Sequence, residues 1–247
     1  MKALALLFLL SSPCIAGQLP STPPNGVTYY TLIHANEGNG SNVWDVQGKK
    51  WQYAESWVSG LFNTGLGISG AANNGNCLAN TSLSYGMSGA WVHVSFKSNS
   101  TTLDSQGHVL AYFNKSSGNY TAIYLYNNTI ILYEFVSGVN KDFDFTPNPG
   151  VRSKKWITLD FIRGATYANY WDVYVNGKFA ISNTTTVTSP ATPTSIVRFG
   201  CGDGSPSMDG ILDELFLANI STPNNSISGM VERMYVSEMG RHNATPY

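Results

Sequence analysis

The chain has 247 residues and a formal net charge of −1, and only 12% of its residues are charged, against about 25% in an average globular protein. Because it has no basic cluster, the composition argues against nucleic acid and anionic membranes as partners. The length suits one all-β domain, since β-sandwiches of this size fold as single units.

The N-terminus has the pattern of a secretory signal peptide. Lys2 precedes the apolar run Ala3–Leu10, and a small-residue end at Ala16 marks a cleavage site. The apolar run is too short to span a bilayer. We therefore expect a secreted protein, extracellular or at the cell surface, without membrane insertion. The predicted divisions are a signal peptide over 1–16, a Pro-rich lead-in over 17–26, a β domain over 27–240 and a tail over 241–247.

Cysteines and sequons agree with export. Cys77 and Cys201 are the only cysteines after the signal peptide, and an even pair in an oxidising compartment predicts one disulfide. Sequons of the Asn-x-Ser/Thr type predict a glycosylated surface, which would keep a chain of low charge soluble. The sequon residues are Asn39, Asn80, Asn99, Asn114, Asn119, Asn127, Asn183, Asn219, Asn224 and Asn243.

Short β-like runs alternate with turn residues along most of the chain, which is typical of an antiparallel sandwich or jelly roll. Asn127-Asn128 and Asn176-Gly177 predict tight hairpin turns. One amphipathic helix is predicted from Ile227 to Gly240, covering an edge or end of the sandwich. The predicted strands are Val27–Ile33, Gly65–Ser69, Ala90–Lys97, Val109–Asn114, Tyr120–Tyr126, Ile130–Phe135, Trp156–Arg163, Tyr170–Val175, Lys178–Ser182, Ser195–Phe199 and Ile211–Ala218.

The segment Met208–Asn219 places an acid in an apolar strand. With period two, Asp213 shares a face with Ile211, Leu215 and Leu217. A carboxylate that faces a core is costly unless it accepts hydrogen bonds or binds a metal. Asp213 therefore needs either backbone N–H donors or a cation.

The order of several motifs resembles the laminin-G-like, concanavalin A-like jelly-roll family of lectin-like modules. HANEGNGSNVWDVQG (residues 34–48) looks like its opening box, and GLFNTGLGISGAANNGNCL (60–78) like the next strand pair. Lys155–Thr158 with the Tyr-x-Asn-Gly hairpin at Tyr174–Lys178 is similar to its central strands, and Asp209–Asn219 to its closing strand. The resemblance implies an all-β antiparallel sandwich with one short C-terminal helix.

Two positions depart from the family pattern. Asn36 stands where the family often has Asp, which weakens an acid cluster in the opening box. Phe216 stands where the family often has Arg, so that an aromatic ring lies on the outer face of the closing strand. This ring is either a contact residue or covered by the terminal helix.

The resemblance also implies a structural calcium ion that bridges the opening loop and the closing strand. Ca²⁺ takes six to eight oxygen ligands in proteins, and Asp213, Glu37, Asp45 and carbonyls around Gly38–Gly40 could supply them. The alternative is that backbone N–H groups of the opening loop satisfy Asp213 without a metal.

Aromatic side chains give the main indication of a ligand surface. Tyr120, Tyr124 and Tyr126 share one strand face. On a strand of the central hairpin lies Trp171, or else, on its other face, Tyr170 and Tyr174 with Asp172. Sugar rings stack on exposed aromatic faces, while amides and carboxylates bind their hydroxyls. Packing in the core is the alternative explanation for the same alternation.

Catalysis has little support in the sequence. The Glu-x-Asp-x-x-Glu strand of jelly-roll glycanases is absent, and Glu55, Glu134, Asp160 and Asp172 are only loose candidates for an acid pair. The four histidines, His34, His93, His108 and His242, have no nucleophile or metal motif near them, so we expect them to be packed or on the surface.

The leading hypothesis is a secreted lectin-like module that binds carbohydrate or a glycosylated surface without catalysis. The alternative is a structural or adhesive surface protein that binds protein partners. An exposed apolar patch around Leu212 and Phe216 would favour that alternative. A glycoside hydrolase or lyase is the third hypothesis.

Overall fold

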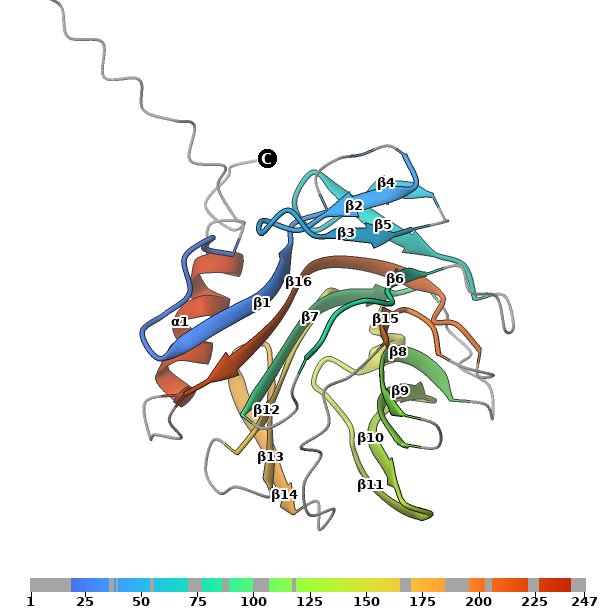
Figure 1. The fold of residues 1–247 in the computed structure, drawn as a ribbon, viewed down its shortest axis with the longest axis vertical. Coiled ribbons are helices and arrows are strands. Elements are labelled where there is room, and N and C mark those ends of the chain that lie inside the picture. Colours follow the sequence, from blue (N-terminus) through green and yellow to red (C-terminus); the bar gives the residue numbers. More distant parts are fainter. Residues whose placement is uncertain are drawn as a thin grey trace, which may run out of the picture.

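The structure, a computed structural model, is described over residues 19–35, 38, 40–53, 56–70, 77–85, 89–99, 107–116, 119–164, 170–184, 196–202, 206–221 and 227–240. These residues form two antiparallel β-sheets, packed as a sandwich, and one C-terminal helix (Figure 1). The predicted all-β sandwich with a single short helix is therefore confirmed.

Sheet A has eight strands. Seven follow the order β14-β13-β12-β7-β16-β5-β4, and β1 pairs with β16 beside this path. The bounds are β1 Val27–Ile33, β4 Trp57–Ser59, β5 Thr64–Ile68, β7 Ala90–Ser98, β12 Ile157–Arg163, β13 Tyr170–Val175, β14 Lys178–Thr184 and β16 Gly210–Ile220.

Sheet B also has eight strands, in the order β11-β10-β9-β8-β15-β6-β3-β2. The bounds are β2 Asn42–Trp44, β3 Lys50–Gln52, β6 Leu78–Asn80, β8 His108–Ser116, β9 Asn119–Tyr126, β10 Thr129–Val136, β11 Val139–Phe145 and β15 Ile196–Phe199. A short 3₁₀ helix, η1, covers Val151–Ser153 between β11 and β12.

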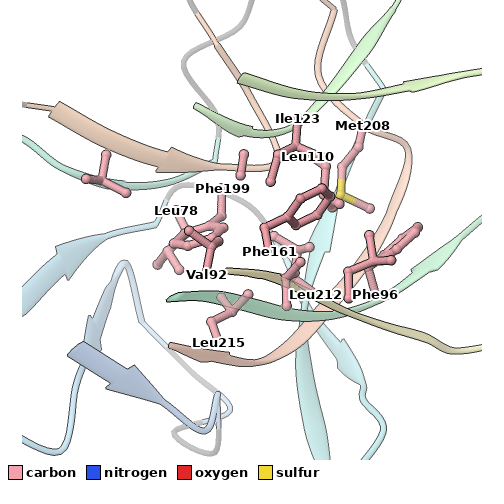
Figure 2. Close-up of a cluster of buried hydrophobic side chains, with 14 of the residues drawn as sticks. Leu78, Val92, Phe96, Leu110, Ile123, Phe161, Phe199, Met208, Leu212 and Leu215 are labelled. Atoms are coloured by element: carbon pink, nitrogen blue, oxygen red, sulfur yellow. The ribbon is translucent and has the colours of Figure 1, made fainter. Parts of the chain in front are cut away.

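The main core lies between the two sheets (Figure 2). Figure 2 shows Val92, Phe161 and Leu215 of sheet A packed with Ile123 and Phe199 of sheet B. Each of these side chains alternates along its strand with one that points to the opposite face of the sheet. Burial of so many large apolar side chains is the main source of stability.

The long strand β16 contains a β-bulge at Asp213-Glu214. Its first part, Gly210–Leu212, pairs with β5, whereas its second part, Leu215–Ile220, pairs with β1. The register with β7 shifts between Asp213 and Leu215, and Glu214 has a φ of 45°. An extra residue of this kind shifts the phase of a strand by one position.

The bulge corrects the predicted alternation of this strand. Strict period two put Ile211 on the core face with Leu215 and Leu217. In the structure Leu212 shares that core with Leu215 and Leu217, while Ile211 is only half-buried. The sequence contains no glycine at the bulge that would have indicated it.

Helix α1, Ile227–Gly240, matches the predicted helix, but it covers a face of sheet A rather than an edge or end of the sandwich. Met230, Val231 and Met234 pack with Phe216 of β16 and Trp91 of β7 in a second apolar cluster. Both methionines therefore serve packing. In the described ranges, no helix is long and apolar enough to cross a membrane.

The same packing decides the role of Phe216. Leu212 and Phe216 are each 0% exposed, because Leu212 faces the main core and Phe216 lies beneath α1. The apolar surface patch that would have favoured protein contacts at these residues is therefore not present.

The predicted disulfide between Cys77 and Cys201 is confirmed. It joins the start of β6 to the end of β15, two strands that pair directly. The bond closes a loop across 124 positions, and in the chain-entropy model a loop of that size contributes about 4–5 kcal/mol. The predicted Asn176-Gly177 turn is also confirmed, with positive φ at both residues.

The Pro-rich lead-in is attached to the domain. Leu19 is 2% exposed and packs in the cluster beneath α1. Its backbone N–H donates to Glu214 Oε2 at 2.9 Å. The segment from Leu19 onward is therefore part of the packed structure and not only an extended linker.

Candidate functional site

Three of the predicted ligand residues lie together on the outer face of β9. Tyr120, Tyr124 and Tyr126 alternate with Thr121, Ile123 and Leu125, which are buried. Tyr126 is 38% exposed, and Tyr120 and Tyr124 are half-buried. The structure therefore places these three tyrosines on the surface side of sheet B.

Neighbouring strands extend this group of rings. In the hairpin register, Phe135 of β10 is opposite Tyr120, and Tyr112 of β8 is opposite Ala122. The ring of Tyr120 stacks on Tyr133 and on Phe135, each with centroids 5.7 Å apart, and Tyr112 lies 5.4 Å from Tyr120. We call the surface formed by Tyr120, Tyr124, Tyr126, Tyr133 and Phe135, together with Tyr112, which is 6% exposed and packs at its border, the tyrosine face.

Sequence reasoning missed Tyr112, Tyr133 and Phe135. The predicted Asn127-Asn128 turn could have found two of them, because a tight hairpin fixes the register of β9 against β10. In that register Tyr133 and Phe135 lie on the same face as Tyr120 and Tyr124.

Polar side chains border the tyrosine face along β11. Asn140 and Asp142 are exposed and pair with Phe135 and Tyr133, and exposed Asp144 pairs with Ile131. On the opposite side, the guanidinium carbon of Arg198 lies 5.9 Å from the ring centroid of Tyr112. The surface therefore combines aromatic rings with carboxylates, an amide and a cation.

The hydroxyl of Tyr120 on the tyrosine face stays neutral. Partial burial, together with the neighbouring hydroxyls of Tyr124 and Tyr133, raises the pKa of Tyr120. A neutral hydroxyl both donates and accepts hydrogen bonds, as a neutral polar ligand requires. The Tyr120 hydroxyl can therefore contact such a ligand without a change of its protonation.

The other predicted ligand residues, Trp171, Asp172 and Tyr174, lie elsewhere. Trp171 is 1% exposed in the main core, Asp172 is 1% exposed and accepts a hydrogen bond from Ser182 Oγ at 2.5 Å, and Tyr174 is 4% exposed beneath α1. This part of the prediction is corrected, because both faces of β13 are covered by packing.

Trp171 instead belongs to a polar contact between the two sheets. Its Nε1–H and Arg163 Nη1 of sheet A both donate to Glu134 Oε1 of sheet B, at 3.2 and 3.3 Å. Glu134 is 1% and Arg163 2% exposed, and burial lowers the pKa of Arg163 while Glu134 opposes this. A buried pair of this kind fixes how the sheets align, because removal of either partner leaves an uncompensated charge.

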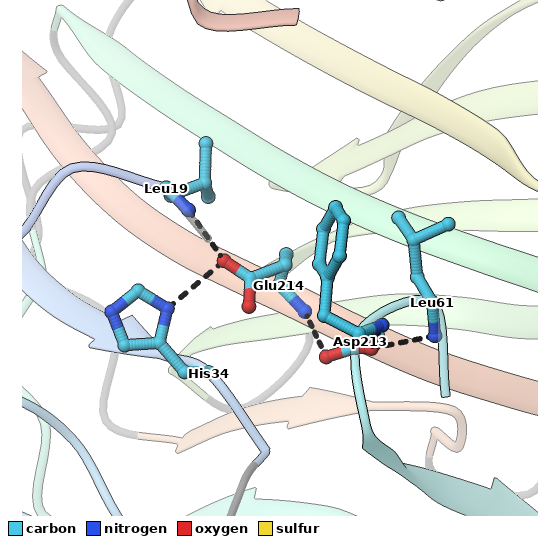
Figure 3. Close-up of polar contacts among 6 residues, drawn as sticks. Leu19, His34, Leu61, Asp213 and Glu214 are labelled. Atoms are coloured by element: carbon cyan, nitrogen blue, oxygen red, sulfur yellow. Dashed lines mark hydrogen bonds and ion pairs between the residues drawn. The ribbon is translucent and has the colours of Figure 1, made fainter. Parts of the chain in front are cut away.

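Asp213 is fully buried and bound by backbone N–H groups. Leu61 and Phe62 donate to Oδ2 at 2.8 and 3.0 Å, and the N–H of Glu214 donates to Oδ1 at 2.9 Å (Figure 3). The first two donors belong to the β4–β5 turn, not to the opening loop that the sequence predicted. Gly60 permits this approach, since a Cβ there would lie 2.5 Å from Asp213 Oδ2.

Glu214 forms a second buried acid beside Asp213. Its Oε2 accepts the Leu19 N–H and lies 2.9 Å from His34 Nδ1 (Figure 3). Its Oε1 is buried without a hydrogen-bond partner in the described structure. Desolvation, followed by repulsion from Glu214, raises the pKa of Asp213 to about 8, and the three backbone N–H donors oppose this rise.

The predicted calcium ligands do not form one cluster within the described residues. Asp45 accepts hydrogen bonds from the N–H groups of Gln47 and Lys49 at 3.0 and 2.7 Å and from Thr31 Oγ1. Asp213 is held by its own donors, and Glu37 lies outside the described residues. No group of three or more metal-ligating side chains occurs in the ranges that the structure describes. Calcium binding stays a prediction.

The acids considered for catalysis take separate partners. Asp160 accepts from Trp91 Nε1 at 2.8 Å and lies 2.7 Å from His93 Nδ1, beneath α1. Glu134 contacts Arg163, and Asp172 contacts Ser182. Glu55 lies outside the described residues. The three described acids are therefore not brought together at one surface.

The sequons differ in their surroundings. Asn99 and Asn127 are exposed, and Asn114, Asn119, Asn183 and Asn219 are half-buried. Asn80 is 6% exposed, and its Nδ2 donates to Lys50 O at 3.2 Å. Asn39, Asn224 and Asn243 lie outside the described residues, so glycosylation stays a prediction.

The fold and the tyrosine face define a β-sandwich module with one covered and one aromatic outer face. No protein-family model and no curated protein sequence matches the chain. Solved structures do match its fold. The binding domain of botulinum neurotoxin serotype D has a TM-score of 0.65 and 11% identity, over 86% of this chain and 52% of that chain. The serotype G binding domain has a TM-score of 0.62 and 12% identity, over 84% and 50%.

A third neighbour is of similar size. Domain 4 of AbnA, a GH43 extracellular arabinanase from Geobacillus stearothermophilus solved in complex with arabinotriose, has a TM-score of 0.62 and 14% identity, over 85% of this chain and 99% of that chain. The chain thus spans about half the length of the toxin binding domains and nearly all of the arabinanase domain. At these identities the likeness establishes the fold alone, and the laminin-G-like branch stays a prediction.

Proposed function

We propose that this chain is a secreted carbohydrate-binding module that binds its ligand on the tyrosine face without catalysis. The observation that carries the proposal is the grouping of six aromatic rings on the outer face of β8, β9 and β10. Helix α1, the single α-helix of the described ranges, packs on sheet A and leaves this face of sheet B uncovered by helix.

The chemistry of the face suits a sugar. Aromatic rings present an apolar platform, and neutral hydroxyls together with carboxylates bind hydroxyl groups at its edge. Tyr124 and Tyr133 supply rings and hydroxyls, while Asn140 and Asp142 supply acceptors on the adjacent strand. Aromatic contacts of this kind have a preferred geometry, so ring position and not charge would select the ligand.

The arabinanase domain and the toxin domains support the proposal by analogy. The arabinanase domain was solved with a bound arabinotriose, and the toxin domains are described as binding or receptor-binding domains. What these proteins bind is a property of those proteins. The likeness supports a binding module in general, and the tyrosine face supplies the argument from this chain's own residues.

The test is a glycan-array screen of the secreted protein, run in calcium and again in chelator. We expect binding to a defined set of glycans, and we expect Tyr124→Ala to weaken it about tenfold, which corresponds to the loss of about 1.4 kcal/mol. Phe179→Ala is the matched control, because Phe179 is 55% exposed but lies on β14 of sheet A.

Each outcome has a distinct meaning. Binding that survives chelation and depends on Tyr124 supports the proposal, with any calcium ion remote from the sugar. Binding that chelation abolishes places a metal at the ligand. No binding to any glycan in either condition, by protein whose thermal melting shows it to be folded, contradicts the proposal.

A further inference from the structure

A second candidate site lies where β1 of sheet A meets the β2–β3 hairpin and β6 of sheet B. The pocket there has a volume of about 500 Å³ and is lined by Tyr30, Lys49, Lys50, Asn80 and the segment 82–84. This volume lies within the range of small-molecule sites, about 300–1,000 Å³, and exceeds what a single ion needs. Strand β15 lies between β6 and β8, so the pocket is separate from the tyrosine face.

The pocket carries positive charge. Both Lys49 and Lys50 line it, and no acidic side chain is among the described residues of its wall. Lys49 Nζ donates to Tyr30 O and lies 6.0 Å from the Tyr30 ring centroid, so its ammonium is held in place. In the part of the chain that the structure describes, neither lysine forms an ion pair. Two ammonium groups without a carboxylate partner attract an anionic group.

Neutral polar groups complete the wall. Asn80 is 6% exposed, and its Oδ1 accepts hydrogen bonds from Ser82 N at 2.9 Å and Ser82 Oγ at 3.2 Å, which orders the chain after β6. Tyr30 and Ser84, which carry hydroxyl groups, line the same wall, and Leu83 adds an apolar residue to it. A hydroxyl group can donate to and accept from a sugar hydroxyl at once.

An exposed tryptophan lies beside this pocket. Trp44 of β2 is the cross-strand partner of Lys50 in β3, so both side chains lie on the same face of the hairpin. The Trp44 side chain is 51% exposed. Val46, which follows two residues later, is 44% exposed. An exposed indole next to a cation offers a stacking surface for a sugar ring whose charged substituent reaches the lysines.

We propose that this pocket binds an acidic saccharide, with the carboxylate or sulfate of one sugar unit at Lys49 and Lys50 and a sugar ring stacked on Trp44. This goes beyond the proposed function, because it assigns a second site and a charged ligand class. A carboxylated and a sulfated sugar share the chemistry that the pocket recognises, and the experiment separates them.

The experiment is isothermal titration calorimetry of the secreted protein with three tetrasaccharides of equal length: one of galacturonic acid, one sulfated and one neutral. We expect an acidic tetrasaccharide to bind more tightly than the neutral one, with affinity that falls as salt rises. Lys50→Gln, Lys49→Gln and Trp44→Ala should each weaken that binding about tenfold. Lys155→Gln is the matched control, because Lys155 is exposed and this substitution removes the same charge at a position away from the pocket.

The outcomes separate this proposal from the preceding one. Tyr124→Ala should leave the binding of acidic tetrasaccharides unchanged even where it weakens binding to the tyrosine face. Binding of the uronate alone, the sulfated sugar alone, or both, with loss in Lys50→Gln, supports the pocket and identifies the acidic group. Three results would overturn it. The neutral tetrasaccharide could bind as tightly as the acidic ones, inorganic sulfate could displace the acidic tetrasaccharide fully and bind with the same affinity as it does, or Lys50→Gln could leave the binding unchanged. Lys50 is exposed, so its variant tests the site without disturbing the Lys49 contact that supports the fold.

Discussion

Asp213 is a buried acid whose desolvation opposes folding. Its carboxylate is 0% exposed and has three backbone N–H donors, yet the second buried acid, Glu214, is its chain neighbour. The bulge at these residues lies where β16 exchanges β5 for β1 as its partner. The side-chain oxygens of Asp213 therefore accept hydrogen bonds from N–H groups of the β4–β5 turn at the place where the sheet pairing changes.

This environment predicts that stability falls as pH rises. In the unfolded chain the Asp213 carboxyl titrates near its ordinary pKa of 3.8, whereas in the folded chain burial raises the pKa to about 8. Between these values the folded state holds one more proton than the unfolded state, so each rise in pH favours unfolding. From pH 5 to pH 8 the loss for this group is up to about 4 kcal/mol. We expect Asp213→Asn to flatten that decline, as measured by urea unfolding at both pH values.

The pH dependence assigned to Asp213 needs a control, because the His34–Glu214 pair lies beside it. His34→Gln keeps a polar side chain beside Glu214 and should leave most of the pH dependence in place. If Asp213→Asn and the parent chain lose the same free energy of unfolding between pH 5 and pH 8, the decline arises from other groups.

At the scale of elements, helix α1 offers a matched pair of identical side chains. Val231 is 1% exposed in the cluster with Phe216, whereas Val236 on the same helix is 57% exposed. Val231→Ala should therefore cost about 2 kcal/mol, because it removes buried methyl groups and leaves a cavity. Val236→Ala should be neutral or slightly stabilising, since Ala has the higher helix propensity. Equal effects in thermal unfolding would mean that α1 does not pack on sheet A as the structure has it.

The elements also show what a sequence can predict. The longer strands, the Asn176-Gly177 turn and helix α1 follow local patterns, and the structure has them at nearly the predicted residues. The three-residue strands β2, β3, β4 and β6 were missed, because a period of two needs more than three residues to be visible. Strand β11 was missed because its exposed polar residues, such as Asn140 and Asp142, mask the alternation with Phe143 and Phe145.

The candidate site was predicted only in part, because the sequence reveals alternation along a strand but not what packs on the strand. Tyr120, Tyr124 and Tyr126 lie on one strand, where alternation alone places them together. Trp171 and Tyr174 occur in an equally aromatic strand, but only the tertiary structure reveals that the opposite sheet covers one and α1 covers the other. Whether an aromatic residue faces solvent depends on which element packs on its sheet, and that information is not local to the strand.

At the scale of the whole molecule, the two sheets have different outer surfaces. Sheet A carries α1 and buries Phe216 and Tyr174 beneath it, whereas sheet B presents the tyrosine face and, farther along, the hairpin with Trp44 and Lys50. Both proposed sites therefore involve sheet B. A ligand long enough to cross β15 and β6 would reach both sites, and its affinity would then exceed that of either fragment.

The predicted glycans are also a property of the whole surface, in a chain of which only 12% of the residues are charged. In protein secreted from a eukaryotic cell, we expect glycans on Asn99 and Asn127, which are exposed, and none on Asn80. A glycan on Asn80 Nδ2 would replace the hydrogen bond to Lys50 O and would fill the pocket between Tyr30 and Lys50. Enzymatic deglycosylation in heavy-oxygen water followed by peptide mass spectrometry measures the occupancy of each sequon. Full occupancy at Asn80 would contradict both its hydrogen bonding in the folded chain and the acidic-saccharide pocket, whereas an unmodified Asn80 beside modified Asn99 and Asn127 is the result that the structure predicts.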